Sequence, residues 1–132
     1  MSFETISVIG LGYIGLPTAA MFASNQRQVI GVDVNKHVVD TINAGKIHIV
    51  EPELDLMVKE AVEKGFLKAT CSPQSADAFL IAVPTPLLPA DSPNSTPQPD
   101  LTHIQSAAKS IAKVLKKGDL VILESTSPVG TT

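Results

Sequence analysis

Residues 5–15 read TISVIGLGYIG, and this stretch decides the fold. Its first residues form an apolar run with the pattern of a buried strand. Apolar side chains at helical spacing follow in Tyr13–Ser24, which predicts a helix. Between the two, Gly10, Gly12 and Gly15 have the spacing G-x-G-x-x-G. The stretch therefore predicts a strand that turns sharply into a helix.

Each glycine of this turn has its own purpose. Gly10 permits the tight turn out of the strand, Gly12 lets a pyrophosphate approach the backbone, and Gly15 lets the helix pack closely. The start of the helix offers N–H groups and a positive dipole end to phosphates. Because a strand precedes the glycines and a helix follows them, we interpret the turn as a dinucleotide-binding site rather than a glycine-rich turn without a ligand.

The rest of the chain alternates between short apolar strands and amphipathic helices. Further strands are predicted at Gln28–Asp33, Leu67–Cys71, Ala78–Val83 and Asp119–Glu124. Further helices are predicted at Lys36–Ala44, Glu53–Lys64 and Leu101–Lys116, the last with Asp100 as its cap. This alternation indicates an α/β fold, a doubly wound parallel sheet of the Rossmann type with helices on both faces. Right-handed crossovers favour the strand order 3-2-1-4-5.

The length of 132 residues corresponds to one domain. A six-stranded dinucleotide fold needs a further helix and strand after Asp119–Glu124. We therefore expect a single domain over residues 1–132 that is cut before the sixth strand. In that case the run Leu120–Leu123 forms an edge without Lys or Pro, and we expect a homo-oligomer.

Asp33 stands at the end of the second predicted strand. A carboxylate at this position accepts hydrogen bonds from the adenosine ribose hydroxyls and repels a 2′-phosphate. The cofactor predicted from this residue is NAD rather than NADP. The nearby cation Lys36 weakens the preference, because it can tolerate a phosphate.

Two more segments follow strands at the carboxyl edge of the predicted sheet, where such folds bind ligands. Thr85, in the segment VPTP, can donate a hydrogen bond to the cofactor, although a rigid turn also explains this segment. After the fifth strand, the hydroxyls of ESTSPVGT (124–131) can reach the nicotinamide ribose or a reacting group. A capped turn explains this second segment equally well.

The composition excludes several classes of protein. Apolar residues make up 44% and charged residues 17%, and the net charge is −3 without a basic cluster, so we expect no nucleic-acid partner. No apolar stretch reaches the length of a membrane span, and no signal peptide is evident, so we expect no membrane association. With a single cysteine, Cys71, the chain forms no internal disulfide, and we expect it in the cytoplasm. The histidines lack the spacing of metal ligands, so no metal site is predicted.

Several motifs together resemble one known family. They are VIGLGYIGLP (8–17), Asp33, Glu51-Pro52, VPTP (83–86), Pro99-Asp100 and STSPVGT (125–131). In this order they resemble the NAD-binding domain of the UDP-glucose/GDP-mannose dehydrogenase family, and the resemblance covers essentially the whole chain. Within that family, the segments GLGYIGLPTA, IHIVEP and VILESTSPVG are most similar to the UDP-N-acetyl-D-mannosamine 6-dehydrogenases.

The resemblance implies an activity for the whole enzyme. Members oxidise the C6 alcohol of the sugar in a nucleotide sugar to a carboxylate with two NAD, through an aldehyde and a cysteine-bound thioester. The resemblance places Tyr13 and Ile14 at the pyrophosphate and Asp33 at the ribose. It places Thr85 and Thr126 along the cofactor near the reacting centre, and it gives Thr126 an auxiliary catalytic part in orienting a water or substrate oxygen.

The family's nucleophilic Cys and its proton-transfer Lys lie downstream of the positions that match this chain. Cys71 does not match that nucleophile, and we expect it to be a small buried residue. The chain alone is therefore expected to be inactive. An alternative remains open, in which the chain is a standalone NAD(H)-binding regulatory module without catalysis.

Overall fold

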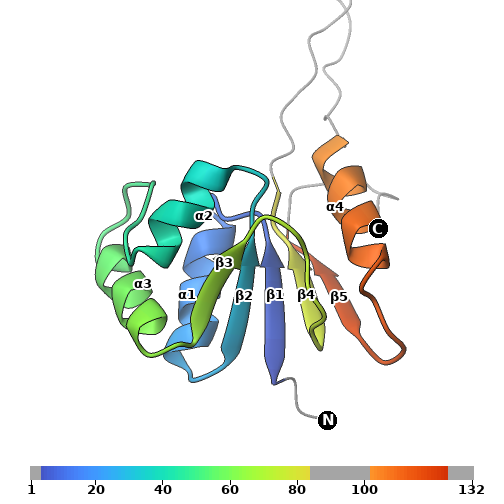
Figure 1. Cartoon of the computed structure of the whole chain (residues 1–132), viewed down its shortest axis with the longest axis horizontal. Helices are drawn as coiled ribbons and strands as arrows, with labels where there is room; N and C mark the ends of the chain where they lie inside the picture. Colours follow the sequence, from blue (N-terminus) through green and yellow to red (C-terminus); the bar gives the residue numbers. More distant parts are fainter. Residues whose placement is uncertain (1–3, 84–101, 125–132) are drawn as a thin grey trace, which may run out of the picture.

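Strand β1 (Thr5–Ile9) lies in the middle of a five-stranded parallel sheet, as Figure 1 shows. The computed structural model describes residues 4–83 and 102–124. The other strands are β2 (Gln28–Val32), β3 (Leu67–Thr70), β4 (Ala78–Ile81) and β5 (Leu120–Leu123). All neighbours pair in parallel in the order β3-β2-β1-β4-β5, which confirms the predicted doubly wound fold.

The helices divide between the two faces of this sheet. They are α1 (Gly15–Ser24), α2 (Lys36–Asn43), α3 (Leu54–Glu63) and α4 (Thr102–Ala112). The chain leaves β1 through α1 to β2, and it leaves β4 through α4 to β5, in the opposite direction across the sheet (Figure 1). Right-handed crossovers that run in opposite directions place their helices on opposite faces.

Side-chain alternation along β1 matches this division. Val8 packs in an apolar cluster with buried residues of α1, α2 and α3, such as Leu16, Ile42 and Val58. The next residue, Ile9, packs instead with Phe79 and with buried residues of α4. Since neighbouring residues of a strand point to opposite faces, β1 is buried between two separate apolar layers.

All four helices are shorter than the sequence predicts, α2 and α3 by only one or two residues. α1 begins at Gly15 rather than Tyr13, because the glycine turn extends through residues 12–14. α4 ends at Ala112 rather than Lys116, because Lys116 is held in a separate turn: its backbone N–H donates to Oδ2 of Asp119 at 2.9 Å. The predicted cap Asp100 lies outside the described residues.

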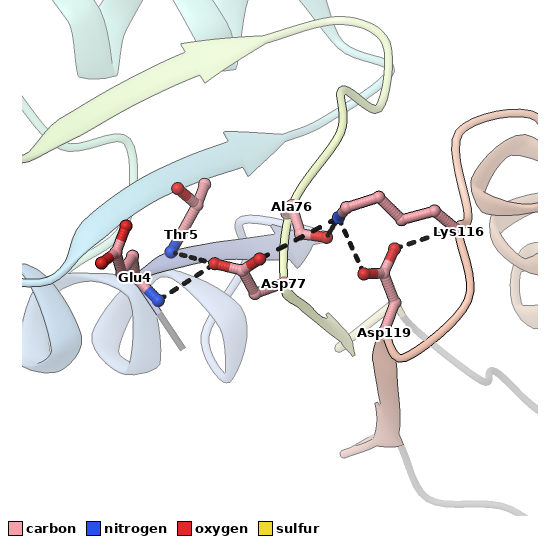
Figure 2. Close-up of polar contacts among 6 residues, drawn as sticks. All are labelled: Glu4, Thr5, Ala76, Asp77, Lys116 and Asp119. Carbon is pink, nitrogen blue, oxygen red and sulfur yellow. Dashed lines mark hydrogen bonds and ion pairs between the residues drawn. The ribbon is translucent and has the colours of Figure 1, made fainter. Parts of the chain in front are cut away.

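Lys116 and Asp77 join three segments at the amino edge of the sheet, where the strands begin (Figure 2). Nζ of Lys116 donates to the Ala76 carbonyl and to Oδ1 of Asp119, both at 2.8 Å, and lies 3.9 Å from Oδ1 of Asp77. Oδ2 of Asp77 accepts from the backbone N–H groups of Glu4 and Thr5, each at 3.0 Å. This amino-edge cluster ties the starts of β1, β4 and β5 together.

Candidate dinucleotide-binding site

The carboxyl edge of the sheet holds a cleft of about 590 Å³. It lies where the strand order reverses, beside the ends of β1, β2 and β4, which is the usual ligand position in doubly wound sheets. The cleft is lined by the ends of β1 and β2, the glycine turn, the segment after β2 with Val38 of α2, the bend after β3, the segment after β4 and one side of α4. Of the predicted cofactor-binding residues in the described ranges, Gly10, Gly12, Tyr13, Ile14 and Asp33 line this cleft, whereas Gly15 does not.

Gly10 forms the turn out of β1 in a conformation that side chains rarely adopt. Its φ is +97°, and its N–H donates to the Val32 carbonyl at 2.7 Å. A Cβ atom on Gly10 would lie 2.6 Å from the Ala82 carbonyl oxygen. The turn therefore requires glycine here, both for its φ and for the closeness of the backbone that follows β4.

Gly15 and Gly12 differ in the space around them. A Cβ atom on Gly15 would lie 1.7 Å from the Gly10 carbonyl oxygen, so the first turn of α1 presses against the glycine turn itself. A Cβ atom on Gly12 would meet nothing within 4 Å. The backbone at Gly12 is thus open toward the cleft, which leaves room for a phosphate to approach it.

The N-terminus of α1 faces this opening without a side-chain cap. Tyr13 and Ile14 line the cleft, but their side chains are 65% and 51% exposed. A phosphate at this place would therefore meet backbone N–H groups and the positive end of the helix rather than a charged side chain. The residues present fit a pyrophosphate group.

Asp33 follows β2 and reaches the same turn. Its Oδ2 accepts from the Leu11 N–H at 3.1 Å, and its Oδ1 accepts from the Asn35 N–H at 2.9 Å. These two bonds fix the carboxylate, and a carboxylate has further lone pairs that can accept from hydroxyl groups. Asp33 is half-buried and lines the cleft, so it can receive the hydroxyls of a ribose.

Thr85 and Thr126 lie outside the described residues. Each belongs to a segment that continues from a described strand: Val83 follows β4, and Glu124 follows β5. The Glu124 N–H donates to the Ile81 carbonyl at 2.8 Å, so the ends of these two strands are adjacent. The predicted contributions of Thr85 and Thr126 remain predictions.

The cleft also contains residues to which the sequence gave no function. Cys71 lines it and is exposed, so the expectation of a buried cysteine is wrong. β3 ends at Thr70, and Cys71 begins a bend that follows the strand instead of lying within it. On α4, His103, Ser106 and Ser110 also line the cleft. Their spacing places them on one side of a helix, but in the sequence this pattern is typical of a solvent-exposed face.

Two further searches apply to residues 4–83 and 102–124. There, no three His, Cys, Asp or Glu side chains come together as ligands of a metal ion would. No helix in these ranges is both long enough and apolar enough to cross a membrane.

Comparison with known proteins finds relatives that are nucleotide-sugar dehydrogenases by name. A model described as the UDP-glucose/GDP-mannose dehydrogenase family, NAD binding domain, matches residues 4–132. The UDP-N-acetyl-D-mannosamine dehydrogenase of Yersinia pestis is 70% identical over the whole chain. The NDP-N-acetyl-D-galactosaminuronic acid dehydrogenase of Ralstonia nicotianae is 64% identical over the whole chain. The chain spans 30% of the length of each of these two relatives.

A solved structure agrees with this relationship. The UDP-D-ManNAc dehydrogenase of Pyrococcus horikoshii superimposes with a TM-score of 0.86 at 45% sequence identity. The alignment covers 97% of this chain and 30% of that protein. With the family match over nearly all of its residues, the chain belongs to the UDP-glucose/GDP-mannose dehydrogenase family and comprises its NAD-binding domain.

Proposed function

We propose that the chain binds NAD in the cleft at the carboxyl edge of the sheet. In this proposal Gly10, Gly12 and Gly15 shape the pyrophosphate site, and the backbone of Tyr13 and Ile14 donates to the phosphates. The observation that carries it is the contrast among the glycines. Gly10 and Gly15 have no space for a side chain, whereas Gly12 is open toward the cleft.

Asp33 determines which dinucleotide binds. Its carboxylate is held by Leu11 and Asn35 and can accept hydrogen bonds from the two ribose hydroxyls of NAD. NADP carries a phosphate at the 2′ position, and its negative charge would face the Asp33 carboxylate. We therefore propose a preference for NAD, with Thr85 and Thr126 contacting the other half of the cofactor.

For the whole enzyme we propose oxidation of UDP-N-acetylmannosamine to UDP-N-acetylmannosaminuronate with two NAD. The relative that is 70% identical supports this substrate by its name, and the 64% identical relative is named for a different amino sugar. Both similarities concern the same 132 residues, 30% of each protein. NAD supplies the hydride acceptor for such an oxidation, and this chain positions it.

Titration calorimetry of the chain with NAD and with NADP tests the proposal. We expect NAD to bind and NADP to bind more weakly. Replacement of Gly12 by Val should block the open backbone and abolish NAD binding while the fold is retained. Absence of NAD binding, or tighter binding of NADP, would refute the assignment.

A further inference from the structure

The side of α4 that faces the cleft carries polar residues at helical spacing. His103, Ser106 and Ser110 line the cleft, and Ala107 lies among them. Positions three and four apart lie on the same face of a helix, so these side chains form one stripe. Ala107 is buried together with Ile104 and Ile111, so the polar members of this stripe are His103, Ser106 and Ser110. This polar stripe has no function in the phosphate and ribose site described above.

The stripe faces an otherwise apolar part of the cleft. The walls next to it come from strand ends and from the bend after β3, and they include Val32, Pro73 and Val83. A flat aromatic base fits such a space, because apolar walls cover its faces and a few polar groups recognise its edge. On the proposed function, Asp33 holds the adenosine ribose, and the attached adenine then extends into this part of the cleft.

The two serines differ in the hydrogen bonds that remain available to them. The Ser110 hydroxyl donates to the Ser106 carbonyl at 3.0 Å, so its proton is used and its oxygen can only accept. The Ser106 hydroxyl makes no hydrogen bond to another described residue, so it can donate. Together they offer an acceptor and a donor one helical turn apart.

The edge of adenine presents the complementary pattern. Its exocyclic amine donates, and the neighbouring ring nitrogen N1 accepts. In hypoxanthine a carbonyl replaces the amine and N1 carries a proton, so donor and acceptor are reversed on this edge. We propose that Ser106 and Ser110 recognise the edge of the adenine base, with Ser110 accepting from the amine and Ser106 donating to a ring nitrogen. This inference rests on the proposed function.

Binding of NAD and of nicotinamide hypoxanthine dinucleotide tests the inference. We expect the 132-residue chain to prefer NAD by about tenfold, the scale of one or two neutral hydrogen bonds. The double variant Ser106→Ala/Ser110→Ala should bind the two dinucleotides about equally, mainly through weaker NAD binding. Alanine is a better helix former than serine, so α4 is retained in this variant.

Ser24→Ala is the matched control. Ser24 also lies in a helix and donates its hydroxyl to a backbone carbonyl, that of Met21 at 2.7 Å, but it is not part of the cleft. It should keep the preference of the unmodified chain. Equal binding of both dinucleotides by the unmodified chain would overturn the inference and leave NAD binding intact, as would an undiminished preference in the double variant. Failure to bind either dinucleotide would instead overturn the proposed function with it.

Discussion

The backbone N–H of Leu11 donates a hydrogen bond to Oδ2 of Asp33 at 3.1 Å. This bond connects the glycine turn after β1 to the end of β2, so the two proposed contact points for the dinucleotide are held at a fixed separation. The carboxylate therefore has two functions, one in holding the turn and one in binding the ribose.

Asp33→Ala should weaken NAD binding by roughly 1–3 kcal/mol, the scale of hydrogen bonds to a charged group. It should also reduce the discrimination against NADP, since the negative charge that faces the 2′-phosphate is removed. Titration calorimetry with both dinucleotides measures each effect. Asp55→Ala, which removes an exposed carboxylate from α3, should change neither.

The glycine turn allows stability and binding to be separated. Gly15→Ala should destabilise the fold by about 1–3 kcal/mol or more, because its Cβ would collide with the Gly10 carbonyl. Gly12→Ala should leave the free energy of unfolding nearly unchanged and weaken NAD binding, because its Cβ fills only the open space of the cleft. Urea unfolding and calorimetry on both variants test the pair. A large loss of unfolding free energy in Gly12→Ala would contradict the open space beside the Gly12 backbone.

The amino-edge cluster predicts a pH dependence of stability. The hydrogen bond from Lys116 lowers the pKa of Asp119 below its ordinary value. The folded state therefore favours the ionised carboxylate. The stabilisation from this ionised carboxylate is fully present above the pKa of an Asp side chain in the unfolded chain, about 4. It is lost as the pH falls through the lowered pKa of Asp119 in the folded chain.

Lys116→Met should lower the urea midpoint at pH 7 and reduce its decline between pH 5 and pH 2. Lys64→Met is the control. Lys64 also lowers the pKa of its partner, Glu60, at 2.6 Å, but this pair is exposed and should contribute little. Equal effects of the two substitutions would show that the cluster adds nothing beyond a surface ion pair.

Strand β5 predicts self-association. It forms one edge of the described sheet, and Leu120, Val121 and Ile122 are 41%, 44% and 42% exposed. An apolar edge without charge or proline is a template for pairing with another strand. We expect the chain to form a homodimer at micromolar concentration and Ile122→Lys to shift it toward monomer in sedimentation. A chain that is monomeric before and after the substitution would contradict this expectation.

Local sequence patterns were enough to predict the fold, because each strand and helix has its own periodicity and the crossover rule leaves few topologies. The glycine turn and Asp33 could be located for the same reason, since their spacing along the chain follows from β1, α1 and β2. Errors arose where individual side-chain contacts, rather than periodicity, decide the local structure. α4 ends early because Asp119 holds the Lys116 backbone, and a helical period contains no sign of that bond.

The part of the cleft formed by α4 was missed for a related reason. His103, Ser106 and Ser110 have the spacing of any polar helix face, and only the packing of α4 on the sheet shows that this face lines the cleft. Cys71 was expected to be buried, in or just after the third strand, and the end of β3 at Thr70 leaves it exposed.

The amino-edge cluster has a practical consequence for mutational work on this family. It lies at the amino ends of β1 and β4, whose carboxyl ends border the cleft, and within residues 4–83 and 102–124 it shares no hydrogen-bonding residue with Asp33 or the glycine turn. Free-energy changes at distant sites without common partners add. Substitutions that strengthen the cluster should therefore raise the free energy of unfolding without changing the cleft. In such a background, destabilising substitutions in the cleft can be studied while the protein stays folded.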